Sequence, residues 1–467
     1  MQIRAGVAAG HPATAEAGAR LLRAGGSAVD AAVAMMLVSC AAETIFTGLS
    51  GGGFATVYDA ATREVTCVDF FVAVPGLDGT VPGAGSAIEV LFVGQPMPYE
   101  IGPATVAVPG VPAGARHLWQ RFGRLPWADV VAPGLAASAG TPFPRTHAVL
   151  LTAIAPAMCV GEGQEVYRRP DGTLLQAGDR LWHRDHHRAY ELLAQDPDAF
   201  YTGAYADALV AAVADGGALS ATDLAGYRVH EHAPQVAVFE GRTVHARGDD
   251  LDDLLGTLAR VAGSVPADPH TDPASARALV AALRGTDRRT ETTNLVAVDA
   301  DGNGCALTTS LGLGSGVWVP GYGVHLNSML GEGELVRGTL DAGLRMGSMM
   351  SPLVVLNQER ALVAAAGAAG GSRIRPALVQ VLLGVLRGAD PQAAIDAPRL
   401  NALPDLVRTE PGFAPAVLEA LAADGDGVAV AAGRDPYFGG VSAISTQGAG
   451  ADPRRNGSVV LLDDPAP

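Results

Sequence analysis

Apolar residues repeat at helical spacing near the start of the chain and then alternate with polar residues in pairs of strands. Residues 12–24 carry apolar side chains at helical spacing. Residues 28–42, for which Ser27 can serve as the cap, are apolar on nearly every side. A helix of that kind is typical of a protein core. The alternating runs 54–60 and 64–75 predict a β-hairpin.

The rest of the chain changes from helical to strand-like patterns. We expect helices and loops over 100–245, and two short helices among polar loops over 246–290. Residues 292–312 alternate on both sides of an Asp-Gly-Asn turn, which is a strong hairpin signal. Residues 351–367 predict a second strand pair, and 376–388 a helix. Strand pairs alternating with buried helices indicate a layered α+β domain.

Composition narrows the classes of function. The chain has 467 residues, 48% of them hydrophobic, which is enough for a sizeable core. A formal net charge of −16 disfavours nucleic acid and anionic membranes as partners. Four scattered cysteines without a C-x-x-C pair indicate buried thiols. Because no long apolar segment is visible, we expect a soluble cytoplasmic protein without a signal peptide.

Thr292 and Thr293 open a predicted strand directly behind a polar loop. A threonine hydroxyl becomes a good nucleophile when the threonine is the first residue of a chain, because its own α-amine can then take the proton. That amine has a pKa of roughly 7.7–8.0. Thr292 reaches this state only if the bond to Glu291 is cut. A threonine pair is also a common start of an ordinary strand, so the residues alone leave both interpretations open.

Two glycine-rich turns are weaker candidates. Ser50 lies in a G-x-S-x-G match at 48–52, but a helix precedes it and a strand follows, the reverse of a nucleophile elbow. Close packing is therefore the favoured interpretation of that turn. The Gly-Gly-Ser-Arg segment at 370–373 lies between a strand and a helix. Its backbone N–H groups could hold an oxyanion, or it could be a tight turn only.

Three histidines, His183, His186 and His187, lie close together in the sequence. A metal site would need carboxylates or thiols at matching spacing, and none is found. We therefore favour Asp185 as a helix cap beside exposed histidines, and we predict no metal.

Several motifs appear in a fixed order along nearly the whole chain. They are HPATAEAGARLLRAGGSAVDAAVA at 11–34, SGGGF at 50–54, TTNLVAVDADGNGCALTTSLG at 292–312, GSMMSP at 347–352 and GAAGGSRI at 367–374. Together they resemble the γ-glutamyltransferase family of N-terminal-nucleophile (Ntn) hydrolases. The resemblance implies a four-layer αββα sandwich. It also implies autocatalytic cleavage into a large-subunit region, 1–291, and a small-subunit region, 292–467, both within one domain.

The resemblance also assigns catalytic roles. Thr292 matches the nucleophile, and Ser310 matches the family's second threonine, which hydrogen-bonds the nucleophile. Gly370 and Gly371 match the glycines whose N–H groups form the oxyanion hole. The family implies no metal or cofactor, and it implies a small-molecule substrate whose acyl group passes through the threonine.

The positions that hold the γ-glutamyl group differ from the family pattern. Phe71 stands where the family has an arginine for the substrate carboxylate, and Ser348 and Met349 stand where it has tandem serines. Gly312 lies near the position of an asparagine that helps to hold the α-amine, so Glu332 is left to meet an amine. These changes predict a less polar acyl group.

Three functions stay open at this stage. The first is a threonine hydrolase of altered specificity that cuts an amide or a C–C bond, the latter as in relatives from alkylproline antibiotic pathways. The second is an ordinary γ-glutamyl enzyme in which Arg373, Arg345 or Arg375 replaces the missing arginine. Arg373 is therefore included among the candidate substrate-binding residues. The third is an uncleaved protein that binds a small molecule.

Overall fold

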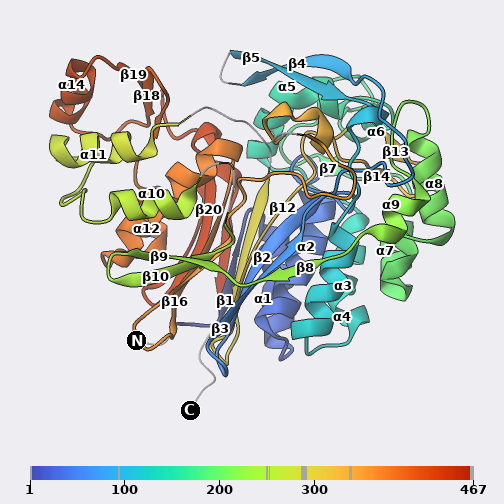
Figure 1. Ribbon diagram of the computed structural model, residues 1–467, viewed down its shortest axis with the longest axis horizontal. Helices are drawn as coiled ribbons and strands as arrows, with labels where there is room; N and C mark the ends of the chain where they lie inside the picture. Colours follow the sequence, from blue (N-terminus) through green and yellow to red (C-terminus); the bar gives the residue numbers. More distant parts are fainter. Residues whose placement is uncertain are drawn as a thin grey trace.

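Two β-sheets packed face to face form the centre of the molecule, and helices cover both outer faces (Figure 1). This is the predicted four-layer αββα arrangement. The computed structural model describes residues 3–92, 95–248, 251, 253–285, 292–335 and 339–462. Within these residues the first sheet has seven antiparallel strands in the order β22 (Ser458–Leu461), β1 (Gly6–Ala9), β11 (Thr293–Val298), β12 (Gly304–Ser310), β2 (Gly52–Asp59), β3 (Glu64–Phe70) and β8 (His230–His232).

The second sheet lies against the first through β16, which contacts β11 and β12. In the described part of the chain it has six antiparallel strands, in the order β21 (Gly448–Ala451), β20 (Gly440–Ser445), β16 (Leu362–Ala369), β15 (Leu353–Leu356), β10 (Arg242–Ala246) and β9 (Gln235–Phe239). Smaller sheets pair β4 (Ser86–Phe92) with β5 (Gln95–Ile101), β6 (Thr141–Pro142) with β7 (Arg180–Leu181), β13 (Trp318–Val319) with β14 (Val324–His325), and β17 (Leu400–Ala402) with β18 (Leu406–Thr409) and β19 (Gly427–Val430).

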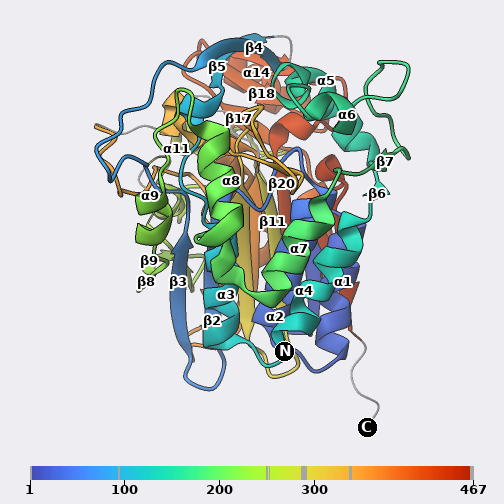
Figure 2. The same ribbon diagram turned by 90° about the vertical axis from the view of Figure 1, so that its right-hand side faces the viewer.

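Helices form the two outer layers (Figures 1 and 2). On the first sheet lie α1 (Pro12–Arg23), α2 (Ala28–Ala42) and α3 (Val111–Phe122), with α4 (Trp127–Ser138) and α7 (His186–Gln195) outside α2. On the second sheet lie α10 (Leu254–Val261), α12 (Ile374–Leu386) and α13 (Pro391–Asp396), with α11 (Pro273–Leu283) and α14 (Pro415–Ala423) beyond them. The others are α5 (Arg145–Met158), α6 (Gly163–Val166), α8 (Gly203–Val213) and α9 (Ala221–Gly226). None of the described helices is long and apolar enough to span a membrane.

Helix α2 begins and lies as its sequence predicts. The Ser27 side chain accepts the Asp30 N–H at 3.0 Å, and the Asp30 carboxylate accepts the Ser27 N–H at 2.8 Å. This capping box satisfies two N–H groups that a helix start otherwise leaves unpaired. Every residue of α2 is buried, because the helix packs between the first sheet and α4.

Strand register brings several chain segments to one end of the sandwich. Thr293, at the start of β11, pairs with Thr309, and Ser310, at the end of β12, pairs with Gly52. In the second sheet, the end of β16 pairs with Gly440 at the start of β20. The Asn294 side-chain amide donates to the Gly440 carbonyl at 3.0 Å, so both sheets meet at this end.

One part of the prediction was wrong. The segment 100–245 was expected to hold only helices and loops, yet β9 and β10 form the edge of the second sheet there. In the C-terminal region, for which no element was predicted, β20 is buried along its whole length between β16 and β21. Pairing with strands that are distant in the sequence stabilises these short segments, and local pattern does not reveal such pairing.

Candidate active site

Thr292 lies directly before β11, with only 1% of its surface exposed. Its Oγ makes no hydrogen bond to any of the described residues. The residues just before it, 286–291, lie outside the described residues, and with them the Glu291 side of the bond that we expect to be cut. A buried hydroxyl without a partner costs about 1–3 kcal/mol. Thr308 and Thr409 share this feature, so it is the position of Thr292 at the strand end that distinguishes it.

Ser310 lies at the same end of the first sheet. Thr293 pairs with Thr309 in antiparallel strands. Continuing this register by one residue places Ser310 opposite Thr292. Ser310 is buried, and its Oγ accepts the Gly312 N–H at 3.0 Å. The structure therefore brings Thr292 and Ser310 together at the ends of neighbouring strands.

Glu43 is a buried acidic residue that the sequence reasoning missed. It follows α2, and its Oε2 accepts the Thr293 hydroxyl at 2.7 Å while its Oε1 accepts the Thr14 hydroxyl at 2.8 Å. Burial raises the pKa of Glu43 to about 6, although both hydroxyl bonds act in the opposite direction. An acidic residue directly after a helix that is apolar on nearly every side was the available signal.

The glycine pair Gly370-Gly371 follows the end of β16 and precedes α12. Both residues have positive φ, 125° and 62°, which glycine adopts without strain. A Cβ on Gly370 would lie 2.9 Å from the Gly439 Cα, so the turn also needs a small residue. Since β16 ends beside Asn294, the glycine pair lies at the same end of the sandwich as Thr292.

Phe71 occupies an apolar cluster. It is 1% exposed, and its ring stacks on Phe54 with the ring centres 5.2 Å apart. The Arg247 guanidinium lies 3.9 Å from the centre of the Phe54 ring and donates to the Ser348 carbonyl at 2.6 Å. The buried Met349 belongs to the same cluster. Phe71, Ser348 and Met349 are therefore brought to one region, where position 71 itself is apolar and the Arg247 guanidinium lies nearby.

Glu332 lies against Gly312. It is 2% exposed, and a Cβ on Gly312 would collide with its carboxylate. The missing side chain at Gly312 therefore leaves room for Glu332. Because Gly312 is hydrogen-bonded to Ser310, this carboxylate lies near the strand end that carries Ser310.

The three arginines considered as replacements have partners elsewhere. Arg373 is buried and donates from Nε to the Tyr437 carbonyl at 3.1 Å. Arg345 forms an ion pair with Asp69 at 3.2 Å. Arg375 donates to a main-chain carbonyl at the end of α11 at 3.0 Å. Each guanidinium is thus already used in holding the fold.

The glycine turn at 48–52 is a packing turn. Ser50 donates its hydroxyl to the His325 carbonyl, and a Cβ on Gly52 would lie 2.6 Å from the Val72 nitrogen. The turn lies between α2 and β2, which is the order that the sequence predicts and the reverse of a nucleophile elbow.

The histidines near α7 differ from expectation. His187 is exposed, but His183 and His186 are buried. His183 Nε2 lies 3.2 Å from the Thr44 hydroxyl, and burial lowers the pKa of this histidine to about 4. Asp185 precedes the helix without a capping hydrogen bond from its side chain. The predicted helix cap at Asp185 is therefore wrong. The predicted exposure is wrong for His183 and His186, because their rings stack on each other inside the protein.

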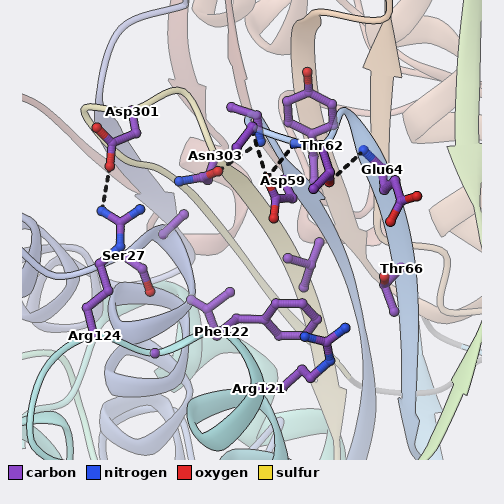
Figure 3. A pocket seen from close by; sticks show the side chains of 17 residues that line it. Ser27, Asp59, Thr62, Glu64, Thr66, Arg121, Phe122, Arg124, Asp301 and Asn303 are labelled. Atoms are coloured by element: carbon purple, nitrogen blue, oxygen red, sulfur yellow. Dashed lines mark hydrogen bonds and ion pairs between the residues drawn. The ribbon is translucent and has the colours of Figure 1, made fainter.

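A cavity of about 720 Å³ opens at the opposite end of the first sheet (Figure 3). It is lined by the turns after β2 and β11, where Arg124 pairs with Asp301 at 2.6 Å. Strand β11 has six residues, so this cavity lies about 20 Å from Thr292 along the strand. Because of this distance, we do not assign the threonine chemistry to this cavity, although it is large.

Comparison with known proteins decides the family. The family model described as gamma-glutamyltranspeptidase matches residues 14–249 and 260–462. The chain belongs to the gamma-glutamyltranspeptidase family. This confirms the resemblance seen in the sequence motifs and makes the protein an enzyme, an acyl hydrolase or transferase of the Ntn type.

Proteins named for different activities are similar to the chain over most of their length. Acylase ACY 1 proenzyme from Pseudomonas sp. (strain SE83) is 28% identical over 510 aligned residues, covering 94% of this chain and 89% of that protein. The glutathione hydrolase proenzyme from Bacillus subtilis (strain 168) is 24% identical, with 98% and 91% covered. The crystal structure of cephalosporin acylase from Bacillus halodurans has a TM-score of 0.79 at 23% identity, covering 99% and 97%, and confirms the fold.

Proposed function

We propose that this enzyme cuts its own chain before Thr292 and then uses Thr292 to hydrolyse an acyl substrate less polar than a γ-glutamyl compound. The observation that carries this proposal is the buried Thr292 hydroxyl without a described hydrogen-bond partner, at the strand end shared with Ser310 and the Gly370 turn. The word proenzyme in the names of both curated relatives supports a processed chain.

Each step of the proposed reaction forms and breaks an ordinary acyl bond. In processing, Thr292 Oγ attacks the Glu291 carbonyl, the acyl group moves from nitrogen to oxygen, and water hydrolyses the ester. The freed α-amine of Thr292 then takes the hydroxyl proton when Oγ attacks the substrate carbonyl. The amine of the substrate leaves with that proton, and water hydrolyses the ester on Thr292 to release the acid and the free threonine. The N–H groups of Gly370 and Gly371 are proposed to stabilise the oxyanion, and Ser310 to hydrogen-bond the nucleophile.

The apolar cluster around Phe71 supports a substrate without a γ-glutamyl carboxylate. An arginine would bind that carboxylate with two parallel hydrogen bonds, and a phenyl ring cannot. Glu332, buried beside Gly312, can still pair with an amine on the substrate. The bond cut is proposed to be an amide, as the names of the acylase relatives suggest. Attack on a ketone with C–C cleavage, as in antibiotic pathways, uses the same nucleophile and stays an alternative outcome.

The first test concerns Thr292. We expect wild-type protein to give two fragments on denaturing electrophoresis, the smaller beginning Thr-Thr-Asn-Leu by mass spectrometry. Thr292→Ala should remain one chain without activity, because both the attacking oxygen and the cut are lost. Thr292→Ser keeps a hydroxyl and should still be cut, more slowly. A wild-type chain that stays whole while it is active would overturn the mechanism and favour an uncleaved enzyme.

The second test concerns the substrate. We expect kcat/KM for a hexanoyl or phenylacetyl anilide to exceed that for γ-glutamyl-p-nitroanilide by at least about tenfold, because no arginine stands at Phe71 to hold the carboxylate. Phe71→Leu keeps the cluster apolar and serves as the matched control, so it should preserve this order. A preference for the γ-glutamyl anilide would instead favour an ordinary γ-glutamyl hydrolase or transferase.

A further inference from the structure

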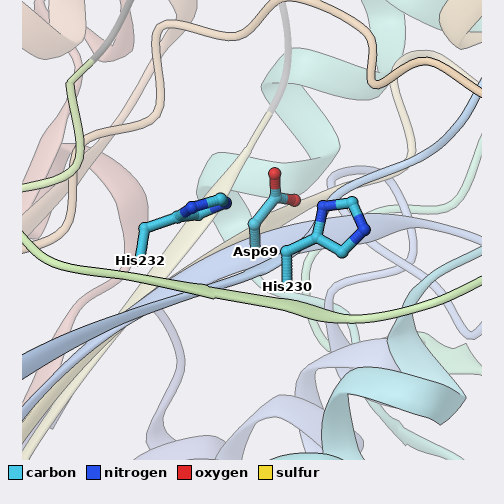
Figure 4. A group of neighbouring side chains, drawn as sticks. All are labelled: Asp69, His230 and His232. Atoms are coloured by element: carbon cyan, nitrogen blue, oxygen red, sulfur yellow. The ribbon is translucent and has the colours of Figure 1, made fainter.

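A carboxylate and two imidazoles stand together where the edge strand β8 pairs with β3. Asp69, His230 and His232 each offer one ligand atom, and these atoms lie within 4.8 Å of one another. Figure 4 shows the three side chains projecting from the same side of the two strands, with the carboxylate between the rings. We propose that this cluster binds a divalent transition-metal ion of the Zn²⁺ class.

Strand pairing arranges these side chains without help from an ion. Asp69 lies directly opposite His230, and His232 lies opposite Cys67, two pairs further along. Residues two apart in a strand point to the same face of a sheet. The three donors therefore share one face because of the register, so an ion needs to order only side chains and not the backbone.

The donor atoms are available for a metal. Both imidazoles are exposed. A neutral imidazole offers one ring nitrogen with a lone pair, which is the usual metal ligand of histidine. The Phe71 N–H, at 2.8 Å, and the Arg345 guanidinium, at 3.2 Å, both use Oδ1 of Asp69. Oδ2 is left for the ion, while these two contacts hold the carboxylate in place.

Ligand chemistry selects the class of ion. Two imidazoles and one carboxylate suit Zn²⁺, Ni²⁺ or Cu²⁺, whereas Mg²⁺ and Ca²⁺ prefer oxygen ligands only. Donors around a tetrahedral Zn²⁺ lie roughly 3.3 Å apart, so small rotations of the exposed rings complete the site. A cavity of about 320 Å³, lined by Asp69, His232 and Arg247, adjoins the cluster and leaves space for water as a further ligand.

The proposed ion lies apart from the threonine chemistry. Asp69 is connected to Asn294, two residues after Thr292, by successive strand pairing across β2 and β12. The two residues are therefore three strands apart, which corresponds to about 14 Å. The ion therefore takes no part in the proposed acyl transfer. It would instead join β8 to β3 and so fix the edge of the first sheet beside the cavity. Failure of the metal proposal would leave the proposed function unaffected.

The experiment titrates protein that carries no polyhistidine tag with Zn²⁺, and separately with Mg²⁺, by isothermal calorimetry. We expect one Zn²⁺ per chain and no measurable Mg²⁺ binding. His230→Ala and His232→Ala should each weaken Zn²⁺ binding at least about tenfold, since each removes one of three protein ligands. His187→Ala, an exposed histidine on α7, is the matched control and should bind like wild type.

A second readout does not depend on affinity alone. Co²⁺ in place of Zn²⁺ should give a visible absorption band in wild type that both β8 variants lose. Excess Zn²⁺ should raise the melting temperature of wild type and of His187→Ala but not of the β8 variants, because an ion that binds only the folded state stabilises it. Zn²⁺ binding that is absent, or that stays unchanged in His230→Ala and His232→Ala, would overturn the proposal.

Discussion

The Glu43 carboxylate receives hydrogen bonds from two threonine hydroxyls that lie far apart in the chain. One comes from Thr14 on α1, and the other from Thr293, which is 250 residues away and next to Thr292. An ionised carboxylate inside a protein is unfavourable unless it is well hydrogen-bonded. Glu43 therefore links the start of β11 to the helical layer and makes the site sensitive to pH.

The raised pKa of Glu43 predicts a pH-dependent stability. Between its ordinary pKa of 4.5 and its folded value of about 6, the folded state holds a proton that the unfolded state releases. The free energy of unfolding should therefore fall by about 2 kcal/mol as the pH rises through this window, and then level off. Glu43→Gln should lack this fall. Urea unfolding from pH 4.5 to 7 measures the free energy of unfolding of both proteins, each in a Thr292→Ala background that prevents cleavage. Parallel pH profiles of the two proteins would contradict the role assigned to Glu43.

Element β20 is held by a buried network of charges. Asp452 accepts from Arg399 at 2.5 Å and from Arg454 at 3.1 Å, and it also accepts the Val441 N–H at 3.0 Å. Burial alone would raise the pKa of Asp452, but the two guanidinium groups outweigh burial and hold that pKa below its usual value. Gly439, directly before β20, packs against Gly370, so this network supports the proposed oxyanion turn.

Removing the central charge should be costly. Asp452→Asn leaves buried Arg399 without its carboxylate partner and leaves Arg454 with Glu410 alone, and we expect a loss of about 3–5 kcal/mol in the free energy of unfolding. Chemical denaturation measures this loss. Asp424→Asn breaks an exposed pair with Arg277 and is the control, because exposed ion pairs contribute little. Equal effects of the two substitutions would contradict the proposed role of burial.

Elements with a clear period were predictable from the sequence. Helix α2 occupies 28–42, the range that its apolar run predicts, and the β11–β12 hairpin lies on both sides of the Asp-Gly-Asn turn. In contrast, β20 is six residues long, begins with glycine and is buried on both faces. Its sequence, GVSAIS, has no alternation that would distinguish it from a loop.

Only the site residues that belong to sequence motifs could be predicted. The motifs point to Thr292, Ser310 and the Gly370 pair, and the register brings the strand ends that carry them together. The role of Glu43 depends on Thr293, a contact that no local pattern reveals. The burial of His183 likewise depends on packing against residues far along the chain.

Across the whole molecule, the two proposed fragments share both sheets. In the first sheet β1 lies between β22 and β11, and β12 pairs with β2. In the second sheet β10, from the N-terminal part, pairs with β15 from the C-terminal part. Separating the fragments would break these ladders and expose the core between the sheets.

The two fragments should therefore stay together after cleavage. We expect them to co-elute on gel filtration in native buffer and to separate only in denaturant, because the buried apolar surface between them is large. Thermal unfolding of wild type and of uncut Thr292→Ala should each show a single transition. Fragments that separate in native buffer would contradict the shared-sheet arrangement.

The pairing of β1 with β22 makes the first and last described segments neighbours. Gly6 lies opposite Leu461, and the Leu462 N–H donates to the Ala5 carbonyl at 3.0 Å. A short linker can therefore join the ends, so that a circularly permuted gene begins at Thr292. After removal of its initiator methionine, such a protein would be synthesised with the threonine amine already free. Its maturation would then depend on gene order and an aminopeptidase rather than on breaking an internal peptide bond.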